Sequence, residues 1–309
     1  ISADRVLVVT SADIAPAVRA VLPSVPPRNF LVEARPMGTA AALAWGASEV
    51  RRRADPNTPV CALHADLAAA FPSALRAGLQ RAAFTALSER ALVAVGVRPT
   101  RAEASFGYLQ VGDPLDSAEG LDRGGAADVA QFTEKPGPDA AAALVRGGAL
   151  WHSGIVVGAA QEFLDALQLY VPEVAPGLTA LASGGVELFA SLVRPVGIER
   201  GLLERIGRLL VIAPEFGWDD VGTWAGLRRV RELDDTGNGA LGAAHFVDAT
   251  GNVVHAEEGT VVMFGVSQLL VVTRPGLTFI TTLARAADLD PLLDSLPGSA
   301  RINPTSLGE

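Results

Sequence analysis

The first two-thirds of the chain alternates short apolar runs with longer amphipathic stretches. Runs such as "RVLVVTS" (5–11), "PVCALHAD" (59–66) and "ALVAVGV" (91–97) are rich in β-branched residues, as is typical of strands buried on both faces. Between them, "GTAAALAWGASEVRRRAD" (38–55) and "PSALRAGLQRAAFTAL" (72–87) have helical character. This alternation predicts an α/β fold, with a Rossmann-like, mostly parallel sheet flanked by helices. Ligands of such sheets bind at the carboxyl ends of the strands.

The pattern changes after Asp235. From there to about residue 283 the chain consists of short β-branched runs separated by Gly, Asn and Asp, with no segment of helical period. Short strands at regular intervals predict a small β-solenoid-like domain. We therefore expect a first domain over residues 1–234 and a second over 235–309.

Composition narrows the classes of function. The 309 residues carry a net charge of −9, which argues against a nucleic-acid-binding protein. No apolar run is long enough to span a membrane, and the first residues lack the pattern of a signal peptide. The single cysteine, Cys61, excludes an intramolecular disulfide and a cysteine-based zinc cluster. We expect a cytoplasmic protein.

Two acidic residues follow predicted buried strands. Asp66 ends "PVCALHAD", and Asp220 lies in "GWDDVG" after the apolar run 208–216. An N-cap role explains either residue alone, since Asp is among the best N-caps, and Asp219 is a candidate cap for a helix near Thr223. Together, however, two carboxylates at the ends of different strands favour a shared Mg²⁺ site, since this ion prefers oxygen ligands.

A third candidate is "FTEKPG" (132–137), in which Glu134 and Lys135 precede a proline that ends the strand. A lysine is a point charge suited to a phosphate, and a neighbouring glutamate accepts hydrogen bonds from sugar hydroxyls. The alternative is a solvated charge pair at a strand end, which is common.

Three further stretches have both a functional and a structural interpretation. Gly38 and Thr39 begin a predicted helix. Either the free N–H groups at its start bind an anion, or Thr39 only caps the helix. Gly107 precedes Tyr108 on a predicted strand, where a glycine permits close approach of a ligand or marks a β-bulge. In "LWHSGIVV", His152 and Ser153 are candidate ligand contacts, although a lone histidine is more often structural.

Taken in order along the chain, these motifs resemble one family. "RPMGTAAAL", "HAD", "FGYLQVG", "FTEKPG", "WHSGIVV" and "EFGWDDVGTW" are similar to segments of the mannose-1-phosphate guanylyltransferases, the GDP-mannose pyrophosphorylases of the sugar nucleotidyltransferase superfamily. The resemblance covers almost the whole chain. It implies that GTP and mannose 1-phosphate react to give GDP-mannose and pyrophosphate, with Mg²⁺ as cofactor and a homodimer as one expected assembly.

The resemblance also implies roles for individual residues. Asp66 and Asp220 would hold the metal and act in catalysis together with Lys135, which would contact the sugar phosphate. The substrates would be bound by a further group of residues: Glu33, Gly38, Thr39, Gly107, Tyr108, Glu134, His152, Ser153 and Gly154.

Some positions depart from the family pattern. The family's opening Gly-rich, Arg-containing loop has no counterpart here, so we expect the chain as given to be a truncated or impaired form with little turnover. Met37 replaces an expected Arg, and His152 replaces an expected Asn. Two alternatives therefore stay open: an inactive homologue that binds sugar nucleotides or regulates a partner, and a transferase for another base or sugar 1-phosphate.

Overall fold

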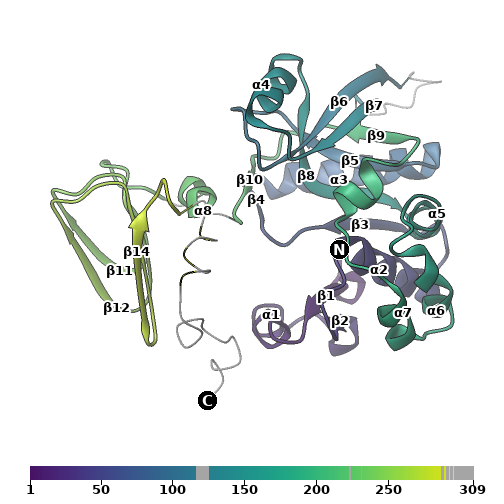
Figure 1. Ribbon diagram of the computed structural model, residues 1–309, viewed down its shortest axis with the longest axis horizontal. Coiled ribbons are helices and arrows are strands. Elements are labelled where there is room, and N and C mark those ends of the chain that lie inside the picture. The colour runs from purple at the N-terminus through teal and green to yellow at the C-terminus, as the bar shows by residue number, and fades with distance from the viewer. Residues whose placement is uncertain are drawn as a thin grey trace. The chain divides into compact units, whose positions relative to one another are not determined.

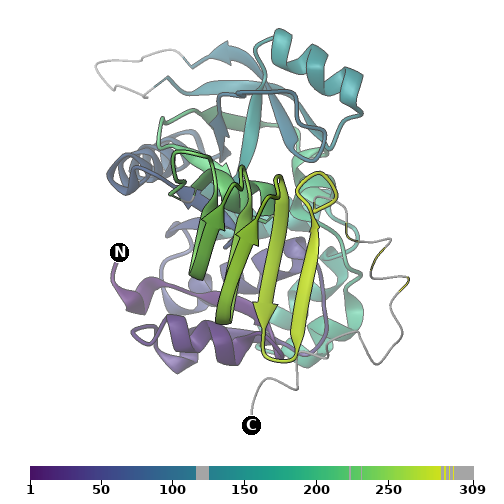
Figure 2. The same ribbon diagram turned by 90° about the vertical axis from the view of Figure 1, so that its left-hand side faces the viewer.

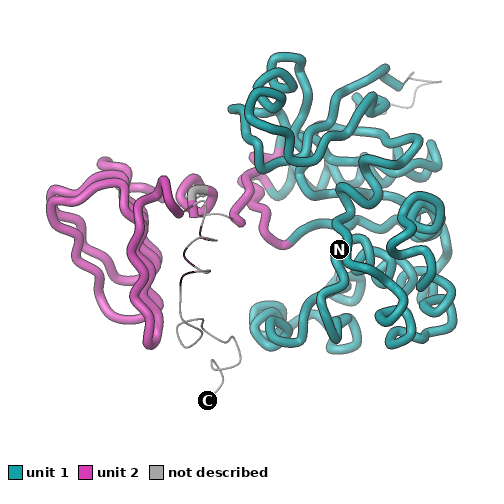
Figure 3. Tube along the Cα trace, in the orientation of Figure 1, with its two compact units in different colours: residues 1–64, 72–215 teal, residues 65–71, 216–309 magenta. Residues whose placement is uncertain are grey.

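The computed structural model describes residues 1–115, 125–222, 224–230 and 232–286, together with the single positions 289, 292 and 295. It divides into two compact units (Figure 3), one formed by residues 1–64 and 72–215 and the other by residues 65–71 and 216–309. We call them unit 1 and unit 2. The boundary at residue 216 is earlier than the predicted domain boundary after residue 234, which stays a prediction because a compact unit is not necessarily a domain.

Unit 1 contains a mixed six-stranded sheet in the order β3-β8-β5-β9-β7-β6. The strands are β3 (Pro59–Leu63), β5 (Leu92–Val97), β6 (Gly107–Pro114), β7 (Ala127–Glu134), β8 (Leu150–Ala159) and β9 (Leu209–Ile212). Of the neighbouring pairs in that order, only β5–β9 is parallel. A separate two-stranded parallel sheet pairs β1 (Val8–Ser11) with β2 (Phe30–Glu33).

Helices cover these sheets (Figure 1). They are α1 (Ala15–Val21), α2 (Thr39–Arg53), α3 (Pro72–Glu89), α4 (Pro138–Arg146), α5 (Ala160–Tyr170), α6 (Leu178–Ala182) and α7 (Val186–Leu192). The largest apolar cluster joins the alanine face of α2 to residues of α5, α6, α7 and the six-stranded sheet. Small side chains on α2 let these elements approach closely, which explains the alanine-rich sequence "GTAAALAWGA". The predicted fold class is confirmed, although the six-stranded sheet is mixed and not mostly parallel.

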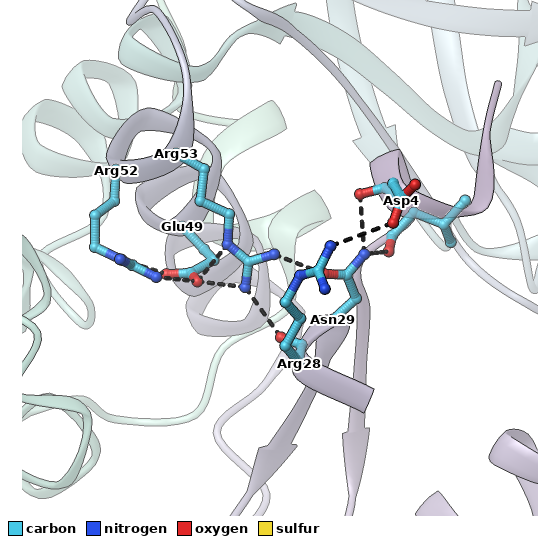
Figure 4. A network of polar contacts seen from close by, with 7 residues as sticks. Asp4, Arg28, Asn29, Glu49, Arg52 and Arg53 are labelled. Atoms are coloured by element: carbon cyan, nitrogen blue, oxygen red, sulfur yellow. Dashed lines mark hydrogen bonds and ion pairs between the residues drawn. The ribbon is translucent and has the colours of Figure 1, made fainter. Parts of the chain in front are cut away.

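Polar side chains connect the N-terminal strands to α2 (Figure 4). The side-chain amide of Asn29, which is fully buried, donates to the carbonyl oxygens of Asp4 and Val6 at 3.0 and 2.9 Å. Its side-chain oxygen accepts from Arg53 at the end of α2, and Arg53 also pairs with Glu49. This network ties the segment before β1 to the helix that packs beside it.

Unit 2 contains two small sheets. One pairs β4 (Leu67–Ala69) with β10 (Trp218–Asp220), and α8 (Trp224–Val230) follows. The other, seen from in front in Figure 2, consists of β11 (Gly239–Val247), β12 (Val253–Phe264), β13 (Leu269–Arg274) and β14 (Leu277–Thr282). The first three of these run parallel and β14 is antiparallel to β13, so the predicted β-rich C-terminal part is confirmed.

Two asparagines stabilise the turns between these parallel strands. Asn238 and Asn252 are buried, and the side-chain oxygen of Asn238 accepts from both the backbone and the side-chain N–H groups of Asn252 at 2.9 Å. Asn252 in turn accepts from the backbone of Leu269 at 2.9 Å. Equivalent turns are thus joined by a ladder of amides, which satisfies buried polar groups that would otherwise be unpaired.

None of the described helices is both long and apolar enough to cross a lipid bilayer.

Candidate active site

The carboxylates of Asp66 and Asp220 converge in unit 2. Strand β10 runs antiparallel to β4, and the N–H of Val221 donates to the carbonyl oxygen of Asp66 at 2.9 Å. Asp220 Oδ1 lies 3.0 Å, and Asp66 Oδ2 3.2 Å, from the point that a Cβ on Gly222 would occupy. The two oxygens are therefore no more than about 6.2 Å apart, the sum of those distances.

A glycine at position 222 leaves the space between these carboxylates open. Its N–H donates to Asp220 Oδ1 at 2.7 Å, which orients that carboxylate. Asp66 is exposed and Asp220 is half-buried, so both are accessible from solvent. Two hard oxygen donors on an open space fit Mg²⁺, which usually keeps several waters and binds one or two carboxylates. Among the described residues, no group of three or more His, Cys, Asp or Glu side chains has metal-binding geometry.

Asp219 has a different partner. Its two carboxylate oxygens accept from the Arg229 guanidinium, each at 2.7 Å, so Asp219 pairs with the end of α8. Thr223, the expected start of that helix, lies outside the described residues. Of the two adjacent acids, Asp220 is therefore the one that faces Asp66.

A second group of polar residues surrounds Glu134 and Lys135 at the end of β7 in unit 1. Lys135 has a left-handed backbone (φ 48°), held by a hydrogen bond from its N–H to the carbonyl oxygen of Phe106 at 3.2 Å. Such a conformation is costly for a residue other than glycine and is often found at functional sites. The Lys135 side chain is 58% exposed, and its Nζ lies 3.8 Å from Glu134 Oε1, so the ammonium is available to an anion.

Glu134 is largely buried, with 11% of its side chain exposed. Burial, and secondly the negative charge of Glu199, raise the pKa of Glu134 to about 7, although Lys135 and Arg200 act in the opposite direction. Its Oε2 lies 2.7 Å from the point that a Cβ on Gly107 would occupy. A side chain at position 107 would meet this carboxylate and the Phe132 ring, so the glycine permits their close packing against β6.

The π-helical turn Glu199–Leu203 contributes residues that the sequence analysis did not identify as site residues. The N–H of Glu204 bonds to the carbonyl oxygen of Glu199 at 2.9 Å, and the Glu204 side chain accepts from the N–H of Glu134 at 2.9 Å. Glu199 Oε1 lies 3.6 Å from His64 Nε2. Glu199 and Glu204 are five positions apart, and residues at that spacing face different directions on an α-helix. Their spacing in the sequence therefore did not indicate that they lie together. A π-turn brings them closer together.

Strand β8 places three of the predicted substrate-binding residues. The Ser153 hydroxyl donates to the carbonyl oxygen of Val95 at 2.7 Å, which joins β8 to β5. Gly154 has a positive φ of 77°, and its carbonyl oxygen accepts from the N–H of His64 at 3.3 Å. His152 is 7% exposed, and neither of its ring nitrogens has a hydrogen-bond partner among the described residues.

Three more of the predicted substrate-binding residues, Glu33, Gly38 and Thr39, lie at the end of β2 and around the start of α2. The Thr39 hydroxyl accepts from the N–H of Ile198 at 2.8 Å, and the N–H of Ala40 donates to the carbonyl oxygen of Val196 at 3.2 Å. Thr39 and Ala40 thus fasten the loop that leads into the π-turn, and Gly38 lies beside Val196 of that loop. At the end of β2, a buried oxygen of Glu33 has no partner among the described residues, and burial raises the pKa of Glu33.

Tyr108 is placed differently from its neighbour Gly107. Its side chain is fully buried, and its hydroxyl donates to the carbonyl oxygen of Glu103 and accepts from the N–H of the same residue, both at 3.0 Å. The hydroxyl proton is thus already used within the protein. Of this pair, Gly107 is the residue that packs beside the Glu134 carboxylate.

Comparison with known proteins shows the family to which the chain belongs. The nucleotidyl transferase family model matches residues 2–236. The chain belongs to the nucleotidyl transferase family. It is 28% identical over 284 residues to mannose-1-phosphate guanylyltransferase ManC of Salmonella typhimurium, covering 88% of this chain and 58% of that protein. The mannose-1-phosphate guanylyltransferase of Escherichia coli K12 is 27% identical, with 88% and 59% covered.

A solved structure has the same fold. The crystal structure described as a mannose-1-phosphate geranyltransferase from Thermus thermophilus superposes with a TM-score of 0.82 at 28% identity, covering 94% of this chain and 84% of that one. The family resemblance predicted from the motifs is therefore confirmed. The chain spans somewhat less than two-thirds of the length of the curated relatives named above.

Proposed function

We propose that this chain is the nucleotidyl-transferring part of an enzyme that makes GDP-mannose from GTP and mannose 1-phosphate. An oxygen of the sugar phosphate would attack the α-phosphorus of GTP, and the bond to the leaving pyrophosphate would break. The observation that carries the proposal is the convergence of Asp66 and Asp220 beside Gly222. The names of the two curated relatives support the choice of substrates.

The proposed site residues form two groups with different roles. Asp66 and Asp220 would hold Mg²⁺, which would neutralise phosphate charge when bound. Lys135 would bind the phosphate of the sugar, while Glu134 would accept hydrogen bonds from sugar hydroxyls beside Gly107. Such catalysis consists of positioning and electrostatic stabilisation, so it needs no protein nucleophile.

The proposal is tested by binding and turnover with purified protein. We expect mannose 1-phosphate and GTP to bind in the presence of Mg²⁺, as measured by calorimetry, more tightly than glucose 1-phosphate and ATP. We expect little pyrophosphate release from the chain as given, and any release should depend on both substrates and on the metal. Failure to bind any sugar 1-phosphate or nucleoside triphosphate would overturn the proposal.

Different outcomes of that experiment separate the alternatives. Tight binding of GDP-mannose without any pyrophosphate release from the full-length protein would favour a sugar-nucleotide-binding role. Release near ~10 s⁻¹, an ordinary enzyme rate, would exclude the binding-only alternative. A preference for a different base or sugar would leave the proposed type of reaction unchanged and would correct only the proposed substrates.

A further inference from the structure

A cavity of about 550 Å³ opens on the surface of unit 1, between one face of α3 and the segment that follows β9. Pockets for small molecules usually measure roughly 300–1,000 Å³ and combine apolar walls with a few polar groups. The walls here include Ala74, Ala77 and Pro214, together with the polar side chains described below. None of the site residues named above lines this cavity, so the proposed reaction does not explain it.

A proline and a glycine hold the two walls of the cavity together. Pro214 is buried, and a Cβ on Gly78 would lie 2.7 Å from both Cβ and Cγ of the proline ring. A glycine at position 78 therefore lets the segment after β9 pack closely on the backbone of α3. The cavity is bounded by a tight contact between two elements of unit 1.

The Thr85 hydroxyl faces the cavity without a protein partner. Thr85 lines the cavity and is only 1% exposed. The Ser88 hydroxyl donates to the carbonyl oxygen of Thr85, and no described residue bonds to the Thr85 hydroxyl. A buried hydroxyl without a partner is costly. Since Thr85 is otherwise enclosed, that partner must come from the cavity, as water or as part of a ligand.

A cation and an aromatic ring lie beside this hydroxyl on α3. Arg81 and Phe84 are three positions apart, so they are neighbours on one face of the helix. Arg81 has no hydrogen bond or ion pair with a described residue, and 48% of Phe84 is exposed. Glu215, the acidic residue of the lining, already faces Arg98 at 3.7 Å. The lining thus offers a free guanidinium next to an open aromatic face.

These groups define the chemistry of a ligand. A guanidinium binds the oxygens of a carboxylate or a phosphate through paired hydrogen bonds. The exposed part of the Phe84 ring favours a second flat ring packed against it. Gln80, which also lines the cavity, and Thr85 can each donate and accept, so they suit polar atoms at the edge of such a ring. A highly charged polyphosphate fits poorly, because Glu215 would repel it.

We propose that this cavity is a second ligand-binding site, for a flat aromatic molecule that bears a single carboxylate or phosphate. An aromatic carboxylate and a nucleoside monophosphate share this chemistry. The lining has no residue in common with Asp66, Asp220 and Lys135. The inference therefore goes beyond the proposed function and does not depend on it.

Calorimetric titration with naphthoate and with guanosine monophosphate tests the site. Arg81→Gln should weaken binding of at least one of these probes about tenfold, the usual effect of losing hydrogen bonds to a charged group. Arg76→Gln is the matched control, because Arg76 is an exposed arginine of the same helix that does not line the cavity. This control should bind both probes as wild type does. The probe whose affinity depends on Arg81 identifies the source of the ligand.

Nuclear magnetic resonance of alanine methyl groups locates the bound probe. Naphthoate should shift the signals of Ala74 and Ala77, which line the cavity, and leave that of Ala141, buried in α4, unchanged. Phe84→Leu should weaken naphthoate binding several-fold, because the stacking partner is lost.

Three results would overturn the proposal. The first is equal affinity of wild type, Arg81→Gln and Arg76→Gln for both probes, and the second is binding that leaves the Ala74 and Ala77 signals in place. The third is a shift of these signals with protein concentration alone, which would show that a second copy of the chain covers this face. Failure to bind GTP or mannose 1-phosphate would overturn the proposed function and leave this inference standing.

Discussion

At the scale of residues, the sequence indicated which residues could carry chemistry better than it indicated what surrounds each side chain. Asp66 and Asp220 were chosen because each follows a predicted strand, and the structure brings their carboxylates together beside Gly222. Tyr108 lies next to Gly107 in the sequence but points into the core, since adjacent residues of a strand face opposite sides. Glu199 was missed as a site residue because its placement depends on a π-turn that no spacing rule reveals.

The proposed Mg²⁺ site predicts a contrast between the adjacent residues Asp219 and Asp220. Asp66→Asn and Asp220→Asn should each weaken Mn²⁺ or Mg²⁺ binding at least about tenfold, because even the loss of a residue that only orients a metal ligand costs that much. Asp219→Asn is the matched control, since Asp219 pairs with Arg229. That pair is partly exposed, so its loss should cost no more than about 1 kcal/mol of folding free energy and leave metal affinity unchanged.

Calorimetric titration or the electron paramagnetic resonance of Mn²⁺ measures this contrast. Equal metal affinities for the Asp219 and Asp220 variants would contradict the assignment of Asp220 as the ligand.

Glu134 predicts a pH dependence of stability. Its pKa is raised from 4.5 to about 7, so the folded protein holds a proton that the unfolded chain has lost between these values. The stabilisation from this protonated carboxyl is complete below about pH 4.5 and is lost as pH rises through 7. Glu134→Gln cannot ionise, so its free energy of unfolding should exceed that of wild type by on the order of 1–3 kcal/mol at pH 8.

Denaturant unfolding of both proteins from pH 4 to pH 8 checks this expectation. The two stability curves should come together below about pH 4.5 and separate above it; parallel curves would show that Glu134 keeps an ordinary pKa.

At the scale of elements, hydrophobic period located most helices and strands of unit 1 but could not assign strand direction. The strands and helices predicted above correspond to β1, β3, β5 to β7 and β9, and to α2 and α3. Strands β4 and β10 were missed because three residues are too few to show a period. The sheet is mixed because β8 runs antiparallel to both β3 and β5, and residue type does not distinguish such pairing from a parallel one.

The close approach of Gly38 to Val196, in the loop before the π-turn, predicts that a side chain at position 38 destabilises the protein. Gly38 has a φ of 82°, and a Cβ there would lie 2.5 and 2.6 Å from the backbone O and N of Val196. Since backbone atoms cannot move aside cheaply, Gly38→Ala should cost about 1–3 kcal/mol. For a chain of this size that lowers the melting temperature by roughly 2–4 °C per kcal/mol.

Gly137→Ala is the control for this substitution. Gly137 precedes α4 with a φ of −61°, and no neighbouring atom lies within 4 Å of the position that a Cβ would take. Thermal unfolding should leave this variant near wild type, and a comparable loss in both variants would show that the contact with Val196 relaxes freely.

At the scale of the whole molecule, the chain path explains why residues 65–71 and 218–220, far apart in sequence, lie side by side. Residues 65–71 belong to unit 2, since β4 pairs with β10, although they lie between two segments of unit 1 in the sequence. Hydrophobic period shows where the chain changes character, near Asp235, but not which distant segment pairs with which. The family match to residues 2–236 ends near that change in character, whereas the compact units separate at residue 216.

This arrangement predicts that metal binding stabilises unit 2 selectively. Asp66 and Asp220 both belong to that unit, and Trp224 of α8 packs on the cluster of Val253 and Leu270 in the parallel strands. A ligand bound only to the folded state adds RT ln(1 + [L]/Kd) to the free energy of unfolding, which is about 2.7 kcal/mol at a hundredfold excess over Kd.

Amide hydrogen exchange in β12 and β13 should therefore slow by up to roughly a hundredfold with Mg²⁺, because these amides exchange when unit 2 unfolds as a whole. Amides of β5 and β9 in unit 1 should exchange at unchanged rates, and Asp220→Asn should remove the effect in unit 2. Equal slowing in both units would mean that they unfold as one cooperative body, and no slowing in either would mean that the two carboxylates do not bind the ion.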